Sequence, residues 1–171
     1  MVQIREEQAG DKTAIRLVHE KAFGQPQEAN LVDKLRQSCI NLVSLVAIIK
    51  GCLVGHIVFS PVTIESHGGV VQGMGLAPMA VLPEYQRQGI GSMLVQEGLR
   101  ILRGSLYPFV IVLGHPDYYL RFGFEPASKY GIRTQWENVP DEAFMILFLD
   151  ESIIHRVSGV ARYQSEFEET M

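Results

Sequence analysis

The sequence predicts an α+β domain built around a mixed, mostly antiparallel sheet with helices on both faces. Strand-like and helix-like segments alternate along the chain. Three strand candidates follow one another between residues 41 and 82 with only a few residues between them. Such short connections join antiparallel strands, because a parallel pair needs a crossover of a dozen or more residues. From residue 89 onward the polar residues recur with the period of a helix.

The first part of the chain predicts one strand and two helices. "VQIREE" (2–7) alternates apolar and polar residues, as a half-buried strand does. Asp11 is expected to cap a helix over residues 12–23, which Gly24 and Pro26 then end. A second helix is expected over residues 27–38. Both have apolar residues at helical spacing, namely Ile15, Val18 and Ala22 in the first and Leu31, Val32 and Leu35 in the second.

The three consecutive strands are expected at "NLVSLVAIIK", "CLVGHIVFSPVTIES" and "GVVQGMGLAPMAVL". Lys50-Gly51 would form the first turn and residues 67–69 the second. A helix then runs to about residue 103, with Gly98 on its apolar side, where a small residue lets a helix approach a sheet closely. The remainder predicts a buried strand at 108–114, a short helix in "HPDYYLRF", and strands beginning at 122, 142 and 159.

Composition indicates one soluble domain spanning residues 1–171. The chain has 171 residues, of which 47% are hydrophobic and 20% charged, an ordinary globular balance. A net charge of −4 does not suggest a general binder of nucleic acid or anionic membranes. Cys39 and Cys52 do not make a disulfide framework. No signal segment or apolar run of about 20 residues is present, so we expect a cytoplasmic protein.

"QRQGIG" (86–91) joins the third strand to the long helix and predicts a phosphate-binding turn. A helix N-terminus offers unpaired N–H groups, and Gly89 and Gly91 let an anion come near the backbone. The alternative is that the two glycines only make a tight turn. The dinucleotide fingerprint needs a third glycine at position 94, where the chain has Leu94, and the Walker-type loop has no match.

The same stretch resembles the GNAT superfamily of N-acetyltransferases, whose turn has the pattern [QR]-x-x-G-x-[GA]. The resemblance extends over "MAVLPEYQRQGIGSMLVQEGL", over the order of the predicted elements, and over "VLGHPDYYLRFGFEPA", where a tyrosine lies four residues before Gly-Phe. "EANLVDKLR" and "VGHIVFSPV" are similar to the YhbS-like bacterial branch of the superfamily. The resemblance implies a splayed central sheet and acetyl-coenzyme A as the cosubstrate.

The resemblance also implies which residues contact acetyl-CoA. The strand residues before the turn would border the pantetheine arm, with a backbone N–H near Val81 donating to the thioester oxygen, and the turn would hold the pyrophosphate. Pro78 agrees with this, since a proline is expected where strand pairing stops. The cofactor-binding residues implied are Met79, Ala80, Val81, Gln86, Arg87, Gln88, Gly89, Ile90, Gly91 and Ser92.

The reaction implied is direct acetyl transfer from the thioester to a primary amine of a small molecule or protein. By carry-over from the family motif, Tyr119 would be the general acid that protonates the leaving thiolate. The alternative is that Tyr119 only packs in an aromatic cluster. His115 stands where many members have asparagine, so no cofactor contact is carried over to it. His115 is either a candidate base or a structural histidine. Glu28, Glu65 and a chain of waters are the other candidates for the base.

Further expectations concern ligands and partners. The histidines show no metal-ligand spacing, so we expect no metal. Additional positive charge for binding the cofactor phosphates is available at Arg100, Arg103, Arg121 or Lys129. The alternative is that each of these residues is ordinary surface charge. A homodimer is possible. The alternatives to an acetyltransferase are a non-catalytic acyl-CoA-binding sensor and a transferase for a longer acyl group.

Overall fold

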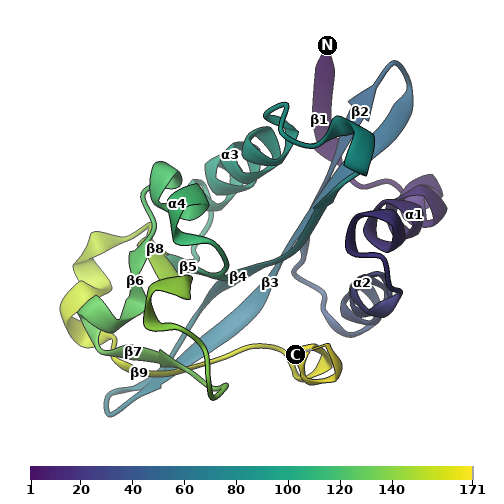
Figure 1. The fold of residues 1–171 in the computed structure, drawn as a ribbon. Helices are drawn as coiled ribbons and strands as arrows, with labels where there is room; N and C mark the ends of the chain where they lie inside the picture. Colours follow the sequence, from purple (N-terminus) through teal and green to yellow (C-terminus); the bar gives the residue numbers. More distant parts are fainter. Residues whose placement is uncertain (171) are drawn as a thin grey trace. The chain divides into compact units, whose positions relative to one another are not determined.

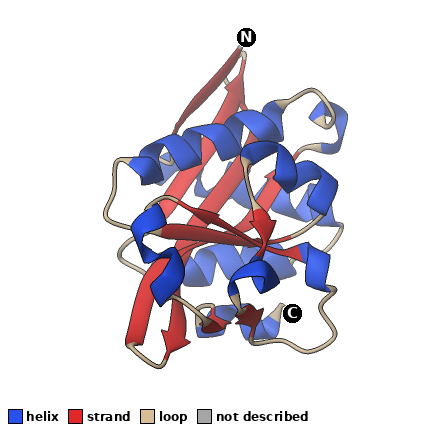
Figure 2. Ribbon diagram, turned by 90° about the vertical axis from the view of Figure 1, so that its left-hand side faces the viewer, coloured by secondary structure: helices blue, strands red, loops and turns tan. Residues whose placement is uncertain are grey.

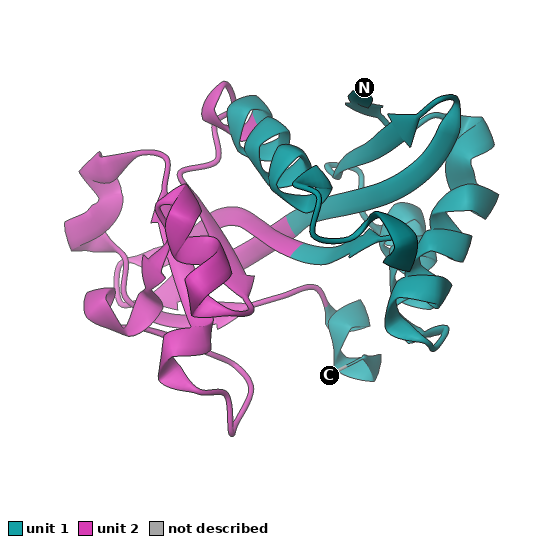
Figure 3. Cartoon of the chain, turned by 45° about the horizontal axis from the view of Figure 1, so that its top comes forward, with its two compact units in different colours: residues 1–60, 77–101, 165–171 teal, residues 61–76, 102–164 magenta. Residues whose placement is uncertain are grey.

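The computed structural model describes residues 1–170, and the chain forms two compact units (Figure 3). The first unit comprises residues 1–60, residues 77–101 and the segment from Ser165 onward. The second comprises residues 61–76 and 102–164. Strands β3 and β4 and helix α3 each contribute residues to both units. That the whole chain is a single domain stays a prediction.

Helices and strands alternate along the chain, as expected of an α+β protein (Figures 1 and 2). The elements up to residue 103 are β1 Val2–Glu6, α1 Lys12–Phe23, α2 Gln27–Ser38, β2 Val43–Ile49, β3 Cys52–Ser66, β4 Gly69–Val81 and α3 Ile90–Arg103. The later elements are β5 Phe109–Leu113, α4 Pro116–Tyr119, β6 Glu125–Pro126, β7 Ile132–Thr134, β8 Phe144–Phe148 and β9 Gly159–Arg162. Short 3-10 helices connect several of them.

The strands of the first unit form the predicted antiparallel meander. β1 pairs with β2 so that Val2 lies opposite Ile49, and β2 pairs with β3 so that Val43 lies opposite Phe59. Lys50 and Gly51 both have positive φ, +48° and +78°, as the tight turns of hairpins require. The end of β4 is tied to β3 by a hydrogen bond from the Leu82 N–H to the Val54 carbonyl of 2.8 Å.

Helices cover both faces of the strands in the first unit, as the sequence predicts. α1 and α2 lie on one face and α3 on the other (Figure 1). Gly98 is the point of closest approach, because a Cβ built on it would lie 2.2 Å from the Phe59 ring on β3. A Cβ on Gly55 would meet Leu94 of α3 at 3.3 Å. The two glycines therefore let α3 pack directly on β3.

The second unit contains the parallel pairs that make the sheet mixed. β4 pairs in parallel with β5, which pairs antiparallel with β8, and β8 with β6. β9 lies antiparallel to β3 and parallel to β7. Antiparallel pairs outnumber parallel ones, as predicted. β7 was not predicted from the sequence, and its three residues lie between the strands expected to begin at 122 and 142.

The expected capping of α1 by the Asp11 side chain is wrong. Asp11 occupies the N-cap position, but its side chain makes no capping hydrogen bond to that helix. Both carboxylate oxygens instead accept from Arg5, at 2.7 and 3.1 Å, and one also accepts the Gln8 N–H at 2.7 Å. The Asp11 carboxylate thus binds Arg5 of β1 and does not cap α1. Between Met1 and Thr170, no helix has the length and apolar character needed to span a membrane.

Candidate active site

The predicted phosphate-binding turn is exposed over residues 86–89 and contains two residues with left-handed φ. β4 ends at Val81, a 3-10 turn follows at Pro83–Tyr85, and α3 begins at Ile90. Arg87 and Gly89 both have left-handed φ, +62° and +86°. A Cβ on Gly89 would meet nothing within 4 Å, so conformation rather than crowding favours glycine there. The two left-handed residues lead the exposed backbone to the N-terminus of α3, which carries the positive end of the helix dipole.

Two glutamine side chains form hydrogen bonds with the backbone of this turn. The Gln86 amide Nε2 donates to the Val81 carbonyl at 2.9 Å, and the Gln88 Nε2 donates to the Glu84 carbonyl at 3.2 Å. Both glutamines, Arg87 and Gly89 are exposed, whereas Ile90 is buried and anchors the start of α3. Gly91 and Ser92, next along α3, are half-buried. The structure therefore brings the predicted pyrophosphate-binding residues together in one turn.

The Val81 N–H points to the edge of β4 that faces away from β3. Successive N–H groups of a strand point to opposite edges. The Leu82 N–H bonds to β3, so the N–H and carbonyl of Val81 face the other edge. The Gln86 amide reaches the Val81 carbonyl on that same edge. Met79 and Val81 are half-buried and Ala80 is buried, so the backbone at the strand end is the exposed polar feature available to a ligand.

Within the second unit, the β4–β5 ladder runs from Met74–Val110 to Leu76–Val112. Pro78, which has no N–H to donate, comes two residues later. This position agrees with the expectation that pairing stops near Pro78. The opening of the two strands beyond Leu76, which the resemblance implies, stays a prediction.

Tyr119 lies at the end of α4 and is only 8% exposed. Its ring packs edge-on against Tyr118 and Phe124, with centroid distances of 4.9 and 5.8 Å. A Cβ on Gly114 would lie 2.5 Å from the Tyr119 ring, so the glycine at the end of β5 makes room for it. Burial, and then the neighbouring Tyr118, raise the pKa of Tyr119 above its ordinary value. The phenol is therefore protonated at neutral pH, as a proton donor must be.

His115 begins the short helix that carries Tyr119. Its backbone carbonyl accepts hydrogen bonds from the N–H groups of Tyr118 and Tyr119, both at 3.2 Å. Its side chain makes no capping hydrogen bond to α4 and is exposed. The backbone of His115 thus positions Tyr119, and this contact favours neither of the alternatives left open for its imidazole.

The remaining candidate residues are mostly engaged with neighbouring side chains. Glu28 accepts from Gln25 at 3.0 Å, and Glu65 from Arg162 at 3.1 Å. Two of the candidate phosphate-binding cations likewise have partners, Glu97 for Arg100 at 2.6 Å and Glu125 for Lys129 at 3.3 Å. Arg121 lies over the Tyr118 ring, 4.6 Å from its centroid, and Arg103 is exposed.

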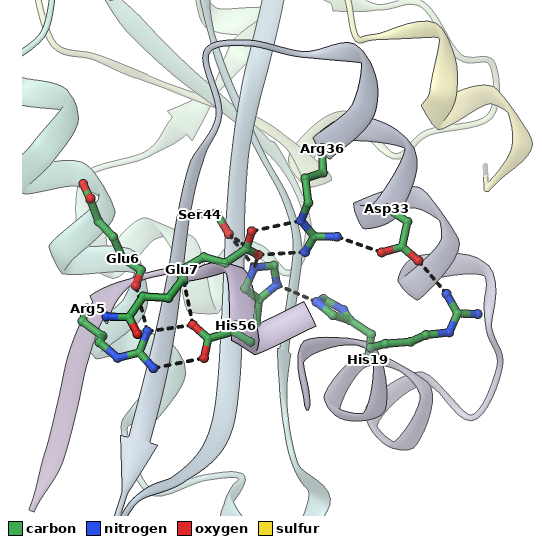
Figure 4. A network of polar contacts seen from close by, with 11 residues as sticks. Arg5, Glu6, Glu7, His19, Asp33, Arg36, Ser44 and His56 are labelled. Atoms are coloured by element: carbon green, nitrogen blue, oxygen red, sulfur yellow. Dashed lines mark hydrogen bonds and ion pairs between the residues drawn. The ribbon is translucent and has the colours of Figure 1, made fainter. Parts of the chain in front are cut away.

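Sequence reasoning missed a buried histidine pair in the first unit (Figure 4). Nε2 of His19, on α1, lies 2.8 Å from Nδ1 of His56, on β3, and both residues are fully buried. Nε2 of His56 lies 2.7 Å from the Ser44 hydroxyl, which donates to Glu7 at 3.1 Å. Arg36 of α2 binds the same Glu7 carboxylate through two nitrogens, at 2.9 and 2.8 Å.

The hydrogen-bond directions in this chain follow from its charged end. A carboxylate only accepts, so Ser44 donates to Glu7 and accepts from His56, whose other nitrogen accepts from His19. Nδ1 of His19 is then a bare acceptor, and it has no hydrogen-bond partner among residues 1–170. Burial, then His56 and Arg36, lower the pKa of His19 to about 3. Burial also lowers the pKa of His56, against the opposing effect of Glu7. Both imidazoles are neutral at physiological pH.

Glu7 is the ionised end of the chain. Burial alone would raise the pKa of Glu7, but the nearby His56 and the hydrogen bonds from Arg36 outweigh it and hold the pKa well below its ordinary value. The carboxylate is thus charged and paired at neutral pH. In the described part of the chain, no three His, Cys, Asp or Glu side chains are grouped so that they would hold a metal ion.

Comparison with known proteins identifies a family and two relatives. Residues 3–127 match the family described as "Acetyltransferase (GNAT) domain". The uncharacterized N-acetyltransferase YhbS of Escherichia coli is 35% identical over 165 residues, which cover 96% of this chain and 97% of the relative. The uncharacterized N-acetyltransferase YjhQ of the same organism is 42% identical over 120 residues, which cover 69% of this chain and 66% of the relative.

Two solved structures are similar over nearly the whole chain. The crystal structure of E. coli YhbS in complex with CoA has a TM-score of 0.89 and 34% identity, covering 98% of this chain and 92% of that one. A GNAT family acetyltransferase from Brucella melitensis in complex with acetyl-CoA has a TM-score of 0.78 and 34% identity, covering 98% of each chain. With the family match over residues 3–127, these likenesses show that the chain belongs to the GNAT superfamily of acetyltransferases.

Proposed function

We propose that the protein transfers the acetyl group of acetyl-CoA directly to a primary amine of a small molecule or protein. The observation that carries the proposal is the turn between β4 and α3, where left-handed residues at positions 87 and 89 leave an exposed backbone at a helix N-terminus. This is the geometry that a pyrophosphate needs. The YhbS and Brucella structures, which hold CoA and acetyl-CoA, support the choice of ligand.

Each group of residues has a distinct role in the proposed reaction. Residues 86–92 bind the pyrophosphate, mainly through backbone N–H groups. Met79, Ala80 and Val81 border the pantetheine arm, and the Val81 N–H, on the edge of β4 away from β3, donates to the thioester oxygen as negative charge develops there. Acetyl-CoA supplies the activated acyl group, and the amine must lose its proton before it attacks.

Tyr119 is the proposed general acid. Its pKa is raised by burial and therefore lies above the ~8.5 that is typical of a thiol. The phenol consequently remains protonated at neutral pH and is available to donate to the departing sulfur as negative charge builds up there. His115, the weaker candidate, begins the helix that holds Tyr119 and would at most assist in removing a proton from the amine.

Thiol release from acetyl-CoA, measured against a panel of primary amines, tests the proposal. Release that depends on one amine class supports an acetyltransferase. Tight acetyl-CoA binding without release above background for any amine would instead indicate a non-catalytic acyl-CoA-binding protein. Faster release from propionyl-CoA or succinyl-CoA than from acetyl-CoA would indicate a transferase for a longer acyl group.

A further inference from the structure

Tyr163 follows β9, and its ring packs against the backbone of β4 within the second unit. A Cβ built on Gly75 would lie 2.9 Å from the Tyr163 ring, so the glycine leaves the space that the ring occupies. Gly75 pairs with Ile111, and the β4–β5 ladder ends one pair later, at Leu76 and Val112. Tyr163 is 8% exposed. A buried aromatic side chain therefore lies beside the end of this ladder.

Tyr163 and Tyr119 contact this pair of strands from opposite faces. Paired residues of two strands share a face, and successive residues of one strand alternate between the faces. Gly75, which accommodates Tyr163, therefore shares a face with Ile111. Gly114, which accommodates Tyr119, comes three residues after Ile111, and its N–H continues the pairing of β5 with the segment before β8. Gly114 thus points to the other face.

The two phenols nevertheless lie near one another. Burial, and then the neighbouring Tyr119, raise the pKa of Tyr163 above its ordinary value. In the proposed reaction Tyr119 donates to the sulfur, so the amine that attacks the carbonyl carbon of the same thioester needs a separate approach. The face that carries Tyr163 offers this approach.

Trp136 extends this aromatic surface toward solvent. Its ring centroid lies 4.8 Å from that of Tyr163, with an angle of 36° between the ring planes. Trp136 is half-buried, so a ligand can contact its indole. The Tyr163 N–H donates to the Gln135 side chain at 2.7 Å, and the Trp136 N–H donates to the Thr134 hydroxyl at 3.3 Å. The loop that carries the indole is therefore tied to the ends of β7 and β9.

We infer that Trp136 contacts the body of the acceptor, and that the acceptor is a primary amine with a flat apolar body, such as an arylalkyl amine. The inference rests on the proposed acetyl transfer. An aromatic ring gains from offset or edge-on packing against the indole. A contact between the ammonium and the indole would instead stabilise the protonated amine, which cannot attack. Tyr163, which is buried, is a positioning residue that supports Trp136.

Fluorescence of Trp136, the only tryptophan of the chain, tests the inference without turnover. The protein is titrated with 2-phenylethylamine and with n-butylamine at constant ionic strength, in the presence of CoA, which carries no acetyl group to transfer. We expect a saturable change with 2-phenylethylamine, with a Kd about threefold or more below that of n-butylamine. Equal affinities, or no saturable change with 2-phenylethylamine, would overturn the inference.

Variants of Trp136 test its role in acetyl transfer to 2-phenylethylamine. Trp136→Leu stays apolar but loses the flat ring, so the KM of this amine should rise about threefold to tenfold while that of acetyl-CoA stays the same. Trp136→Phe should restore most of the loss. Tyr107→Leu, at a half-buried aromatic residue before β5, is the matched control. An unchanged KM in Trp136→Leu, or an equal rise in Tyr107→Leu, would overturn the inference.

Failure of the proposed function has a different result. Saturable binding of 2-phenylethylamine at Trp136 without acetyl transfer to any amine would contradict the proposed reaction while supporting the contact with the indole. Acetyl transfer to n-butylamine and 2-phenylethylamine with equal KM would support the reaction and overturn the assignment of Trp136.

Discussion

The side-chain amide of Gln86 donates a 2.9 Å hydrogen bond to the backbone carbonyl of Val81. The bond spans the turn and fixes the end of β4 relative to the backbone that precedes α3. Gln86 therefore serves the turn through its amide donor, as a positioning residue. Arginine also carries suitable N–H donors at this distance from the backbone, and it is the other residue that the family pattern permits at this position.

Replacing the donor tests this role. Gln86→Met keeps the length of the side chain and removes the hydrogen bond, so we expect the Kd of acetyl-CoA to rise about tenfold. Gln86→Arg should stay within about threefold of the original chain, because a donor is retained. Gln96→Met, at an exposed glutamine later in α3, is the matched control, and a loss there as large as that of Gln86→Met would contradict the assignment. Isothermal titration with acetyl-CoA measures all three.

A second prediction separates backbone from side-chain contacts in the pyrophosphate-binding turn. Gly91→Leu places a side chain beside the first N–H groups of α3, and we expect it to weaken acetyl-CoA binding about tenfold or more. Arg87→Ala removes an exposed charge, for which about threefold is expected. The comparison is made by equilibrium binding at constant ionic strength. A larger effect of Arg87→Ala than of Gly91→Leu would show that side-chain charge, not backbone, holds the pyrophosphate.

A third prediction concerns Tyr119. Tyr119→Phe keeps the ring that packs against Gly114 and Phe124 and removes only the hydroxyl, so we expect folding to be retained. Turnover should fall about 10²-fold with little change in the Kd of acetyl-CoA, because a general acid acts on the leaving group. Tyr118→Phe is the control and should retain most of the turnover. Unchanged turnover in Tyr119→Phe would show that Tyr119 contributes packing only and is not the general acid.

A fourth prediction concerns acid stability. The pKa of His19 is about 3 in the folded chain and about 6.5 when unfolded, so only the unfolded state takes up its proton between these values. The free energy of unfolding should therefore decrease as pH falls below 6.5, by at most about 1.4 kcal/mol per pH unit from this residue. His56 acts in the same direction.

Urea unfolding of the original chain and of His19→Leu between pH 7 and pH 5 measures this effect. This interval lies above the range where carboxylates with lowered pKa, such as Glu7, take up protons. The slope of unfolding free energy against pH should be smaller for His19→Leu, whatever its absolute stability. Equal slopes would show that His19 contributes no proton uptake on unfolding.

Much of the fold could be predicted because the apolar periodicity is regular. α1 and α2 begin and end at the predicted residues, since Gly24 and Pro26 interrupt the chain between them. The placement of Gly98 on the sheet side of α3 was predicted from its position in the apolar stripe, and the Phe59 ring occupies the space that a side chain would need. Local pattern was sufficient for these features because the ends and the apolar face of a helix are set by residues within a few turns, whichever strand the helix packs against.

The features that could not be predicted depend on partners far apart in the chain. His19 and His56 come from different elements 37 residues apart. The only local signals are that His19 follows Val18 on the apolar side of α1 and that His56 interrupts a buried apolar strand. β7 has three residues and shows no periodicity of its own, because its pairing is supplied by β9.

The space above Gly114 has a consequence for catalysis that goes beyond packing. A Cβ at this position would collide with the Tyr119 ring, while Tyr118 and Phe124 flank the ring on other sides. The phenol is consequently preorganised, since its rotational freedom is lost when the protein folds and not when a substrate arrives. If Tyr119 is the general acid proposed above, the packing around β5 and α4 orients its hydroxyl, and a side chain at position 114 would lower turnover by displacing the ring.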